Sequence, residues 1–208
     1  MILIGQYDSP FVRRVGIALT LYDLPFEHWP WSTFGDADRL QAYSPLLRVP
    51  VLVADDGDIL LDSHGIIDHV DGLVTSGSTM LPTDEPARRR AMKSVSLATG
   101  ISDKAVSLFY ENVLHDHPST QWIERCKRQI GAALATLELE GSRRATAFWS
   151  GERIGHADIA IGAMLDHLIA AHPKLFDLEQ YPALREHADL LRAMPVFQSI
   201  YQPFIPPA

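Results

Sequence analysis

The chain has 208 residues, of which 47% are hydrophobic, so it can bury one large core or two small ones and is too apolar to be disordered. Its net charge of −8 argues against nucleic acid and against an anionic membrane surface as main partners. It contains no apolar run of the length that a membrane span needs, and Met1-Ile2-Leu3-Ile4-Gly5 favours a strand over a signal peptide. The single Cys126 excludes an internal disulfide and suits a reducing compartment. We therefore expect a cytoplasmic protein.

The first third of the chain alternates short apolar runs with helical patterns. We expect strands near residues 2–4, 26–29, 49–53 and 59–61, and helices from 10 to 22, 37 to 43 and 63 to 74. The initial β-α-β order predicts a parallel strand pair with a right-handed crossover. Asp55-Asp56-Gly57-Asp58 is a hairpin turn signal between the last two strands. Together these elements predict a β-α-β-α-β-β-α domain.

The rest of the chain shows helical periodicity and no further convincing strand. Residues 72–86 are rich in Gly, Ser, Thr and Pro and indicate a linker, which we place at 76–86 between domains 1–75 and 87–208. We expect helices near 86–113, 120–137, 156–171, 184–192 and 196–201. The pattern at 156–171 is apolar nearly all round, which is typical of a buried central helix. The fold class is thus α/β followed by all-α.

The start of the first helix is the first candidate functional site. Ser9 is placed as an N-cap and Pro10 as the first helical residue, where its missing N–H costs nothing. A helix N-terminus carries unpaired N–H groups and roughly half a positive charge, so it stabilises an anion such as a thiolate. An ordinary cap without a functional role is the alternative for Ser9 taken by itself.

Four motifs, in order along the chain, resemble the glutathione S-transferase superfamily. They are Ser9-Pro10-Phe11-Val12-Arg13, Ser44-Pro45-Leu46-Leu47-Arg48-Val49-Pro50-Val51-Leu52, Asp62-Ser63 and Gly155-His156-Ala157-Asp158-Ile159. The resemblance covers essentially the whole chain. It implies a thioredoxin-like glutathione-binding domain, an all-helical substrate-binding domain and a homodimer. It also implies glutathione as co-substrate and no metal.

The resemblance implies a set of glutathione-binding residues. They are Phe11, Arg48, Val49, Pro50, Asp62 and Ser63. In the family the bond before Pro50 is cis, which would leave the main chain of Val49 free to pair with the extended peptide. We expect Ser63, as the cap of its helix, to hold the γ-glutamyl carboxylate, while Asp62 takes the ammonium group or helps to cap the helix. A cap without a ligand role is the alternative here too.

The motif at Gly155 is interpreted as structural. Family members generally have Ser or Thr where Gly155 stands, and glycine caps only slightly less well. Asp158 is expected to reach back to the N–H groups of the cap, with Ile154 and Ile159 as a hydrophobic staple. This motif supports the family and says nothing about substrate.

One departure from the family bears on chemistry. Members that carry out thiol–disulfide exchange have cysteine where Ser9 stands, so a mixed disulfide with glutathione cannot form here. The serine favours activation of the glutathione thiolate. Tyr7 is the rival for that role, because several classes use a tyrosine after the first strand. Arg13 and Arg14 are interpreted as structural, with contact to a glutathione carboxylate as the alternative.

The expected function is a glutathione transferase acting on a small electrophilic, apolar substrate in detoxification. Phe109 and Tyr110 suggest an apolar or aromatic ligand, although a helical core needs the same residue types. His115-Asp116-His117 is interpreted as a solvated turn and not as a metal site. The alternatives are a transferase-fold module that binds protein partners with little activity, and a specialised catabolic enzyme that cleaves ethers or removes halogen.

Overall fold

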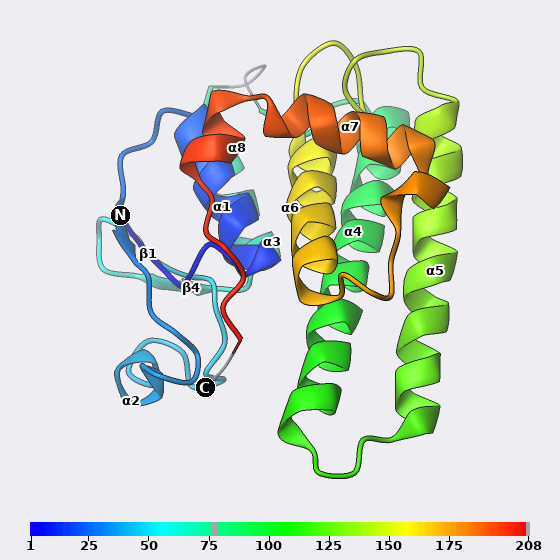
Figure 1. Cartoon of the computed structure of the whole chain (residues 1–208). Helices are drawn as coiled ribbons and strands as arrows, with labels where there is room; N and C mark the ends of the chain where they lie inside the picture. Colours follow the sequence, from blue (N-terminus) through cyan, green and yellow to red (C-terminus); the bar gives the residue numbers. More distant parts are fainter. Residues whose placement is uncertain (76–78, 207–208) are drawn as a thin grey trace. The chain divides into compact units, whose positions relative to one another are not determined.

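The structure, a computed structural model, describes residues 1–75 and 79–206 (Figure 1). It divides into two compact units, Met1–Met80 with Met194–Ala208, and Leu81–Ala193. Residues 194–206 therefore group with the first unit, whereas the sequence pattern assigned everything from 87 to 208 to one helical domain. The cause is a long-range contact of Arg13, described below. Of the expected linker 76–86, residues 76–78 lie outside the described residues, and a helix already begins at Glu85.

The first unit contains a four-stranded mixed sheet. Its strands are β1 (Ile2–Ile4), β2 (Glu27–Trp29), β3 (Val51–Val53) and β4 (Ile59–Leu61), in the spatial order β2-β1-β3-β4. β1 pairs with β2 in parallel, with Ile2 opposite Glu27, as the crossover rule predicts. β1 and β4 each pair with β3 antiparallel. The predicted hairpin at residues 55–58 is confirmed.

Alternate residues of the sheet face two different cores, as the period of a strand requires. Leu3 and Leu52 face a core that also holds Val12 and Val15 of helix α1 (Pro10–Leu21) and Ile66 of helix α3 (Ser63–Gly72). Ile4 and Val51 belong to a smaller cluster with Leu40 of the short helix α2 (Ala37–Leu40). Helix α8 (Pro195–Ser199) packs against α1. The residues named from both cores are fully buried.

The second unit is helical. Its elements are α4 (Glu85–Leu114), α5 (Thr120–Ser142), α6 (His156–Ala171), the 3₁₀ turn η1 (Leu178–Gln180) and α7 (Pro182–Arg192). The prediction that α6 is the buried central helix is confirmed, since it is buried over most of its length and packs against α4 and α7. Asp158 accepts a hydrogen bond from the Gly155 N–H at 2.8 Å, which confirms the expected reach back to the cap. Within the described residues, no helix is both long and apolar enough to cross a bilayer.

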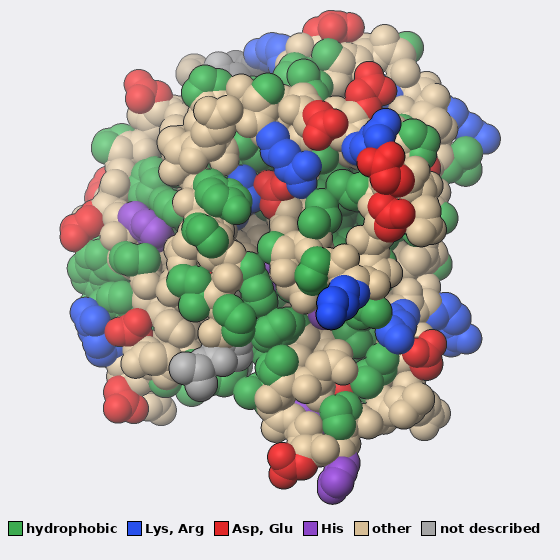
Figure 2. All heavy atoms as spheres, in the orientation of Figure 1, with side chains coloured by type: hydrophobic (Ala, Val, Ile, Leu, Met, Phe, Trp, Pro, Cys, Tyr) green, Lys and Arg blue, Asp and Glu red, His purple; other side chains and the backbone are tan. Residues whose placement is uncertain are grey.

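The surface carries mixed charge. On the face drawn in Figure 2, acidic and basic side chains are interspersed among hydrophobic and polar ones. Elsewhere in the described residues, oppositely charged side chains form ion pairs, such as Lys93 with Glu140 at 2.8 Å and Arg192 with Asp166 at 2.8 Å. Exposed pairs of this kind contribute little to stability.

Candidate functional site

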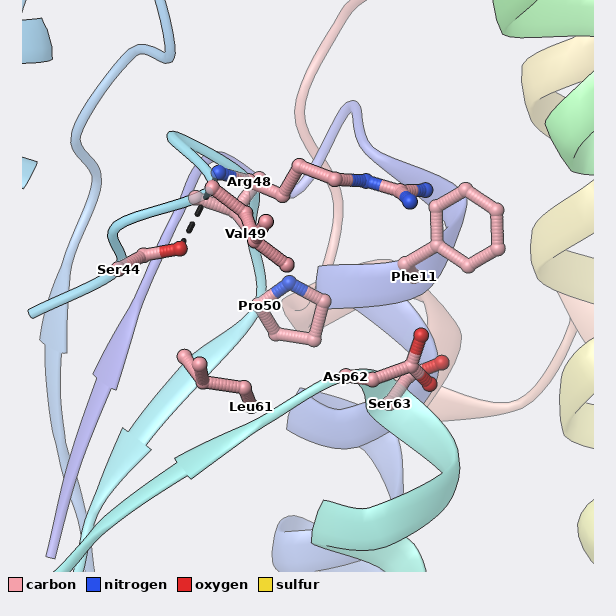
Figure 3. Close-up of a pocket in the computed structure, with 9 residues that line it drawn as sticks. Phe11, Ser44, Arg48, Val49, Pro50, Leu61, Asp62 and Ser63 are labelled. Carbon is pink, nitrogen blue, oxygen red and sulfur yellow. Dashed lines mark hydrogen bonds between the residues drawn. The ribbon is translucent and has the colours of Figure 1, made fainter.

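The first unit contains a hollow at the rim of its sheet. About 410 Å³ of space, part of it open to solvent, is not filled by atoms there. The lining residues come from the start of α1, the loop before β3, the end of β4 and the start of α3: Phe11, Ser44, Leu46, Arg48, Val49, Pro50, Leu61, Asp62 and Ser63. The structure thus brings to one place all the residues for which the sequence resemblance implied glutathione binding (Figure 3). Ser44, Leu46 and Leu61 are additional to that set.

Ser9 lies at the start of α1, two residues before Phe11. It is the N-cap, as predicted, and its Oγ accepts a hydrogen bond from the Val12 N–H at 3.4 Å. The side chain is partly exposed and is not part of the hollow's lining. A hydroxyl can accept one bond and still donate its own hydrogen. Ser9 can therefore cap the helix and donate to an anion at the same time.

The loop before β3 presents main-chain groups to the hollow. The Val49–Pro50 bond is cis, and among the described residues neither the N–H nor the carbonyl of Val49 takes part in a main-chain hydrogen bond. Ser44 is buried and accepts from the Arg48 N–H at 3.2 Å, which fixes the loop. An extended peptide can therefore pair with Val49 as a further strand would.

Gly5 allows this loop to approach α1, and the sequence analysis gave it no role. It has φ 129°, and a Cβ there would lie 2.5 Å from Val12 Cγ2 and 2.8 Å from Val49 Cβ. Only glycine accepts both that dihedral angle and that contact without strain. The signal in the sequence was a glycine immediately after the first strand.

At the start of α3 the cap is Asp62, as one of the two roles expected for it, and the expectation that Ser63 is the cap was wrong. The Asp62 carboxylate accepts from the His64 N–H at 2.9 Å, and its φ of 64° turns the chain into the helix. Ser63 is the first helical residue and is buried, with 2% of its surface exposed. Because it lies one position further along, its side chain turns into the protein instead of over the helix end.

Burial raises the pKa of Asp62, but the hydrogen bonds from the His64 N–H and ring, with the charge of Arg48, outweigh it and leave the pKa below its ordinary value. Asp62 is therefore a carboxylate at neutral pH. In Figure 3 its oxygens lie below Arg48 and Phe11. The hollow thus presents one anion and one cation at opposite sides.

Arg14 lies beneath this corner. Its side chain is 2% exposed and its Nη1 donates to Ser63 Oγ at 3.3 Å. Burial lowers the pKa of Arg14 to about 10, partly offset by the Asp62 carboxylate, so the guanidinium is charged at neutral pH. Sequence reasoning favoured a structural role for Arg14 without giving it a partner. The structure places its positive charge directly behind Ser63.

Tyr7 is held by packing on both sides. Its ring stacks on His28 with centroids 3.9 Å apart, and a Cβ at Gly16 would lie 2.8 Å from Tyr7 Cε1. Burial raises the pKa of Tyr7 to about 12. A phenol with this pKa is protonated at neutral pH. The ring is not among the residues that line the hollow.

The remaining candidates lie in the helical unit. Cys126 is fully buried, and burial raises the pKa of its thiol, as expected for a core residue and not for a nucleophile. The His115-Asp116-His117 segment follows α4 and is exposed. The structure shows no grouping of three or more His, Cys, Asp or Glu suited to a metal in the part of the chain that it describes.

The fold and the hollow together define a class: a thioredoxin-like domain with a cis-proline loop beside a capped helix, followed by a helical unit. Two family models match the chain, "Glutathione S-transferase, N-terminal domain" over residues 3–76 and "Glutathione S-transferase, C-terminal domain" over residues 120–189. The chain belongs to the glutathione S-transferase superfamily, which confirms the resemblance and supports glutathione transferase activity.

Relatives and solved structures agree with this membership. The chain is 32% identical to the uncharacterised GST-like protein YibF of Escherichia coli K12, over 66% of this chain and 68% of YibF. It is 29% identical to maleylacetoacetate isomerase of Pseudomonas aeruginosa over the full length of both chains. A glutathione S-transferase of Methylobacterium radiotolerans, solved with glutathione sulfonate, superposes with a TM-score of 0.90 at 29% identity, covering 100% of this chain and 98% of that one.

Proposed function

We propose that this transferase binds glutathione in the hollow of its first unit and activates the thiol with Ser9 for attack on a small, apolar electrophile. One observation carries the proposal. The main chain of Val49 and the charged helix start at Asp62–Ser63 line one hollow together with Phe11, and the Ser9 hydroxyl caps the helix to which Phe11 belongs, two residues before it. Glutathione is a short extended peptide with two carboxylates, one ammonium group and one thiol, and this site offers a partner for each.

The proposed pose follows from charge and hydrogen bonding. The Val49 N–H and carbonyl pair with the main chain of the central cysteine. Asp62 takes the γ-glutamyl ammonium, while Ser63 and the N–H groups of α3 take the adjacent carboxylate, with Arg14 behind them. Arg48 supplies a cation for the second carboxylate. Phe11 and Pro50 cover apolar parts of the peptide.

The energetics of thiol activation are within reach of one residue and its helix. A free thiol has a pKa near 8.5, so lowering it by about 2 units needs roughly 2.7 kcal/mol. A hydrogen bond to a charged group contributes about 1.5–3 kcal/mol. A helix N-terminus adds about 0.3–1 kcal/mol. Ser9 and α1 together therefore suffice, and no metal enters the step.

In the proposed reaction the glutathione sulfur attacks an electrophilic carbon. The C–S bond forms with the electron pair of the thiolate, and either a leaving group departs with its own pair or the adduct takes up a proton. We assign glutathione binding to residues 1–75 and substrate choice to the helical part that begins at residue 87. A homodimer, a cytoplasmic location and a role in detoxification complete the proposal.

The first test is calorimetric titration with glutathione. We expect micromolar to low-millimolar binding to the wild type and clearly weaker binding to Ser63→Ala. Ser142→Ala is the control, because Ser142 is an exposed serine at the end of α5. Failure of the wild type to bind at high millimolar glutathione would favour a module that binds protein partners with little activity.

The second test is a screen of electrophiles at saturating glutathione. Aryl halides, epoxides and unsaturated carbonyl compounds cover the main types of electrophilic carbon. Maleylacetoacetate belongs in the screen, because a relative that is 29% identical over the full length carries the name of its isomerase. Turnover of any of these compounds with the wild type supports an enzyme, and binding of glutathione without turnover of any of them contradicts one.

A further inference from the structure

The C-terminal segment of the chain lies across the loop that carries Ser9. Gln202 Oε1 accepts a hydrogen bond from the Tyr7 N–H at 3.2 Å, and the Ile205 N–H donates to Asp8 Oδ2 at 3.1 Å. Tyr7 and Asp8 are the two residues immediately before Ser9. In Figure 1 the red segment after α8 runs beside α1 toward the end of the chain. The main chain just before the Ser9 cap is therefore hydrogen-bonded to a residue 195 positions further along the sequence.

Arg13 anchors this segment. It is 4% exposed, its Nε donates to the Ile200 carbonyl at 2.9 Å and its Nη2 donates to the Phe197 carbonyl at 3.0 Å. The guanidinium also lies 5.2 Å from the centre of the Tyr201 ring, within the range of a cation–π contact. Arg13 belongs to the first turns of α1, so the helix that Ser9 caps is the same helix that binds the segment.

Packing fixes the Tyr7 side chain from the same side. A Cβ on Gly16 would meet Tyr7 Cε1 at 2.8 Å and Ile200 Cγ2 at 3.1 Å, so the glycine lets both residues lie against α1. Ile200 is buried, with 8% of its surface exposed. The main chain of Tyr7 is thus held by Gln202, and its side chain packs on the same face of Gly16 as Ile200.

We propose that residues 200–205 form a strap that positions the Ser9 loop for thiol activation, with Arg13 as its anchor and Gln202 and Asp8 as positioning residues. The proposal rests on the proposed function of Ser9. The strap acts on the loop between β1 and α1, while the glutathione peptide is held by Val49, Asp62 and Ser63. Its loss therefore affects the reacting sulfur more than the affinity for the peptide.

The test compares the wild type with Gln202→Met and with a chain that ends at Tyr201. Methionine keeps the length of the glutamine side chain and removes its acceptor oxygen. We expect kcat to fall about 3- to 10-fold in Gln202→Met, the range for one lost hydrogen bond, and further in the shortened chain. The pH profile should shift to a higher pKa for the bound thiol, while the Kd for glutathione stays within about twofold. A purely structural role would lower Tm without moving that pKa.

Gln121→Met on the exposed start of α5 is the matched control and should behave as wild type. The double variant Gln202→Met with Arg13→Met should lose less kcat, expressed as free energy, than the sum of the losses in the two single variants, because both substitutions release the same strap. Unchanged kcat and unchanged thiol pKa in the shortened chain would overturn the strap while leaving Ser9 activation intact. A higher kcat would also overturn it, by showing that the segment obstructs the site. Absence of glutathione binding or of turnover in the wild type would count against the proposed function and not against the strap alone.

Discussion

The two helices that begin at the hollow carry the same residue type at their starts, yet they use it in different ways. In α1 the serine is the cap, and Ser9 Oγ accepts from the Val12 N–H at 3.4 Å. In α3 the serine is one position later, the cap is Asp62, and Ser63 Oγ receives a hydrogen bond from buried Arg14 at 3.3 Å. A shift of one residue thus turns an outward hydroxyl into an inward one. The position in the first turn decides which partner the serine meets.

The N-termini of α1 and α3 also differ in the charged groups that they carry. The start of α3 has the Asp62 carboxylate and the Arg14 guanidinium within one corner, which suits a zwitterion. The start of α1 offers a neutral hydroxyl and the N–H groups of the helix, which suits the single negative charge that a thiol acquires when it ionises. Binding of the peptide and activation of its sulfur are therefore assigned to separate helices, and they can be broken separately.

The largest effect is expected from Ser9→Ala. Loss of a hydrogen bond to the thiolate should lower kcat/KM about 10- to 100-fold and raise the pKa of the bound thiol, read from the pH profile. The matched control is Ser119→Ala, because Ser119 caps α5 with a similar bond of 3.3 Å to the Trp122 N–H. Both changes should lower stability alike, and only Ser9→Ala should lower activity. Equal kinetics in the two variants would remove Ser9 from the mechanism.

Arg14→Met should act on the other helix start. It removes the partner of Ser63 and the positive charge behind the proposed carboxylate, so we expect the Kd for glutathione to rise about tenfold. At saturating glutathione kcat should change little, because in the proposed pose the sulfur lies at α1. Arg89→Met, at an exposed position of α4, is the control. If Arg14→Met unfolds the protein, Arg14→Lys keeps the charge but not the planar donor fork, and should give a smaller rise in Kd.

Asp62→Asn should raise the Kd for glutathione less than Arg14→Met does. Asparagine also caps helices and has the size and shape of aspartate, so the fold should persist while the charge for the proposed ammonium contact is lost. We expect a Kd about threefold higher at pH 7. Because the pKa of Asp62 is below its ordinary value in the folded chain, its stabilising charge is present above about pH 3.9 and is lost as the pH falls through the lowered value. The unfolding free energies of wild type and Asp62→Asn should therefore converge in acid. Asp84→Asn, at the cap of α4, is the control.

The smallest effect is expected from Tyr7→Phe. Since the pKa of Tyr7 is about 12, its hydroxyl contributes no charge at working pH, and the ring packing survives in phenylalanine. Activity should stay within about twofold and the thiol pKa should not move. A large rise in that pKa would transfer the activating role from Ser9 to Tyr7.

The sequence by itself determined the features that neighbours along the chain create. Strand alternation, the Ser9 cap three residues from its Val12 partner, the hairpin turn and the helix α6, apolar nearly all round, are patterns of short range, and each was predicted. Six of the nine residues that line the hollow were also in the predicted set, because the family motifs contain them. Helix ends were less exact, as in α2, which ends at Leu40 and not at the expected Tyr43. Ends depend on side-chain caps and packing that periodicity does not record.

Tertiary structure alone decided how buried cations are used. Arg14 meets Ser63 across 49 residues and Arg13 meets the Ile200 carbonyl across 187, and no local pattern distinguishes these adjacent arginines. A buried guanidinium must find partners wherever the fold supplies oxygen atoms, so its contacts follow from packing. That requirement joins residues 194–206 to the first unit and turns Ser63 inward. Local sequence thus determined where α1 and α3 begin, and the burial of Arg13 and Arg14 determined which distant residues contact each helix start.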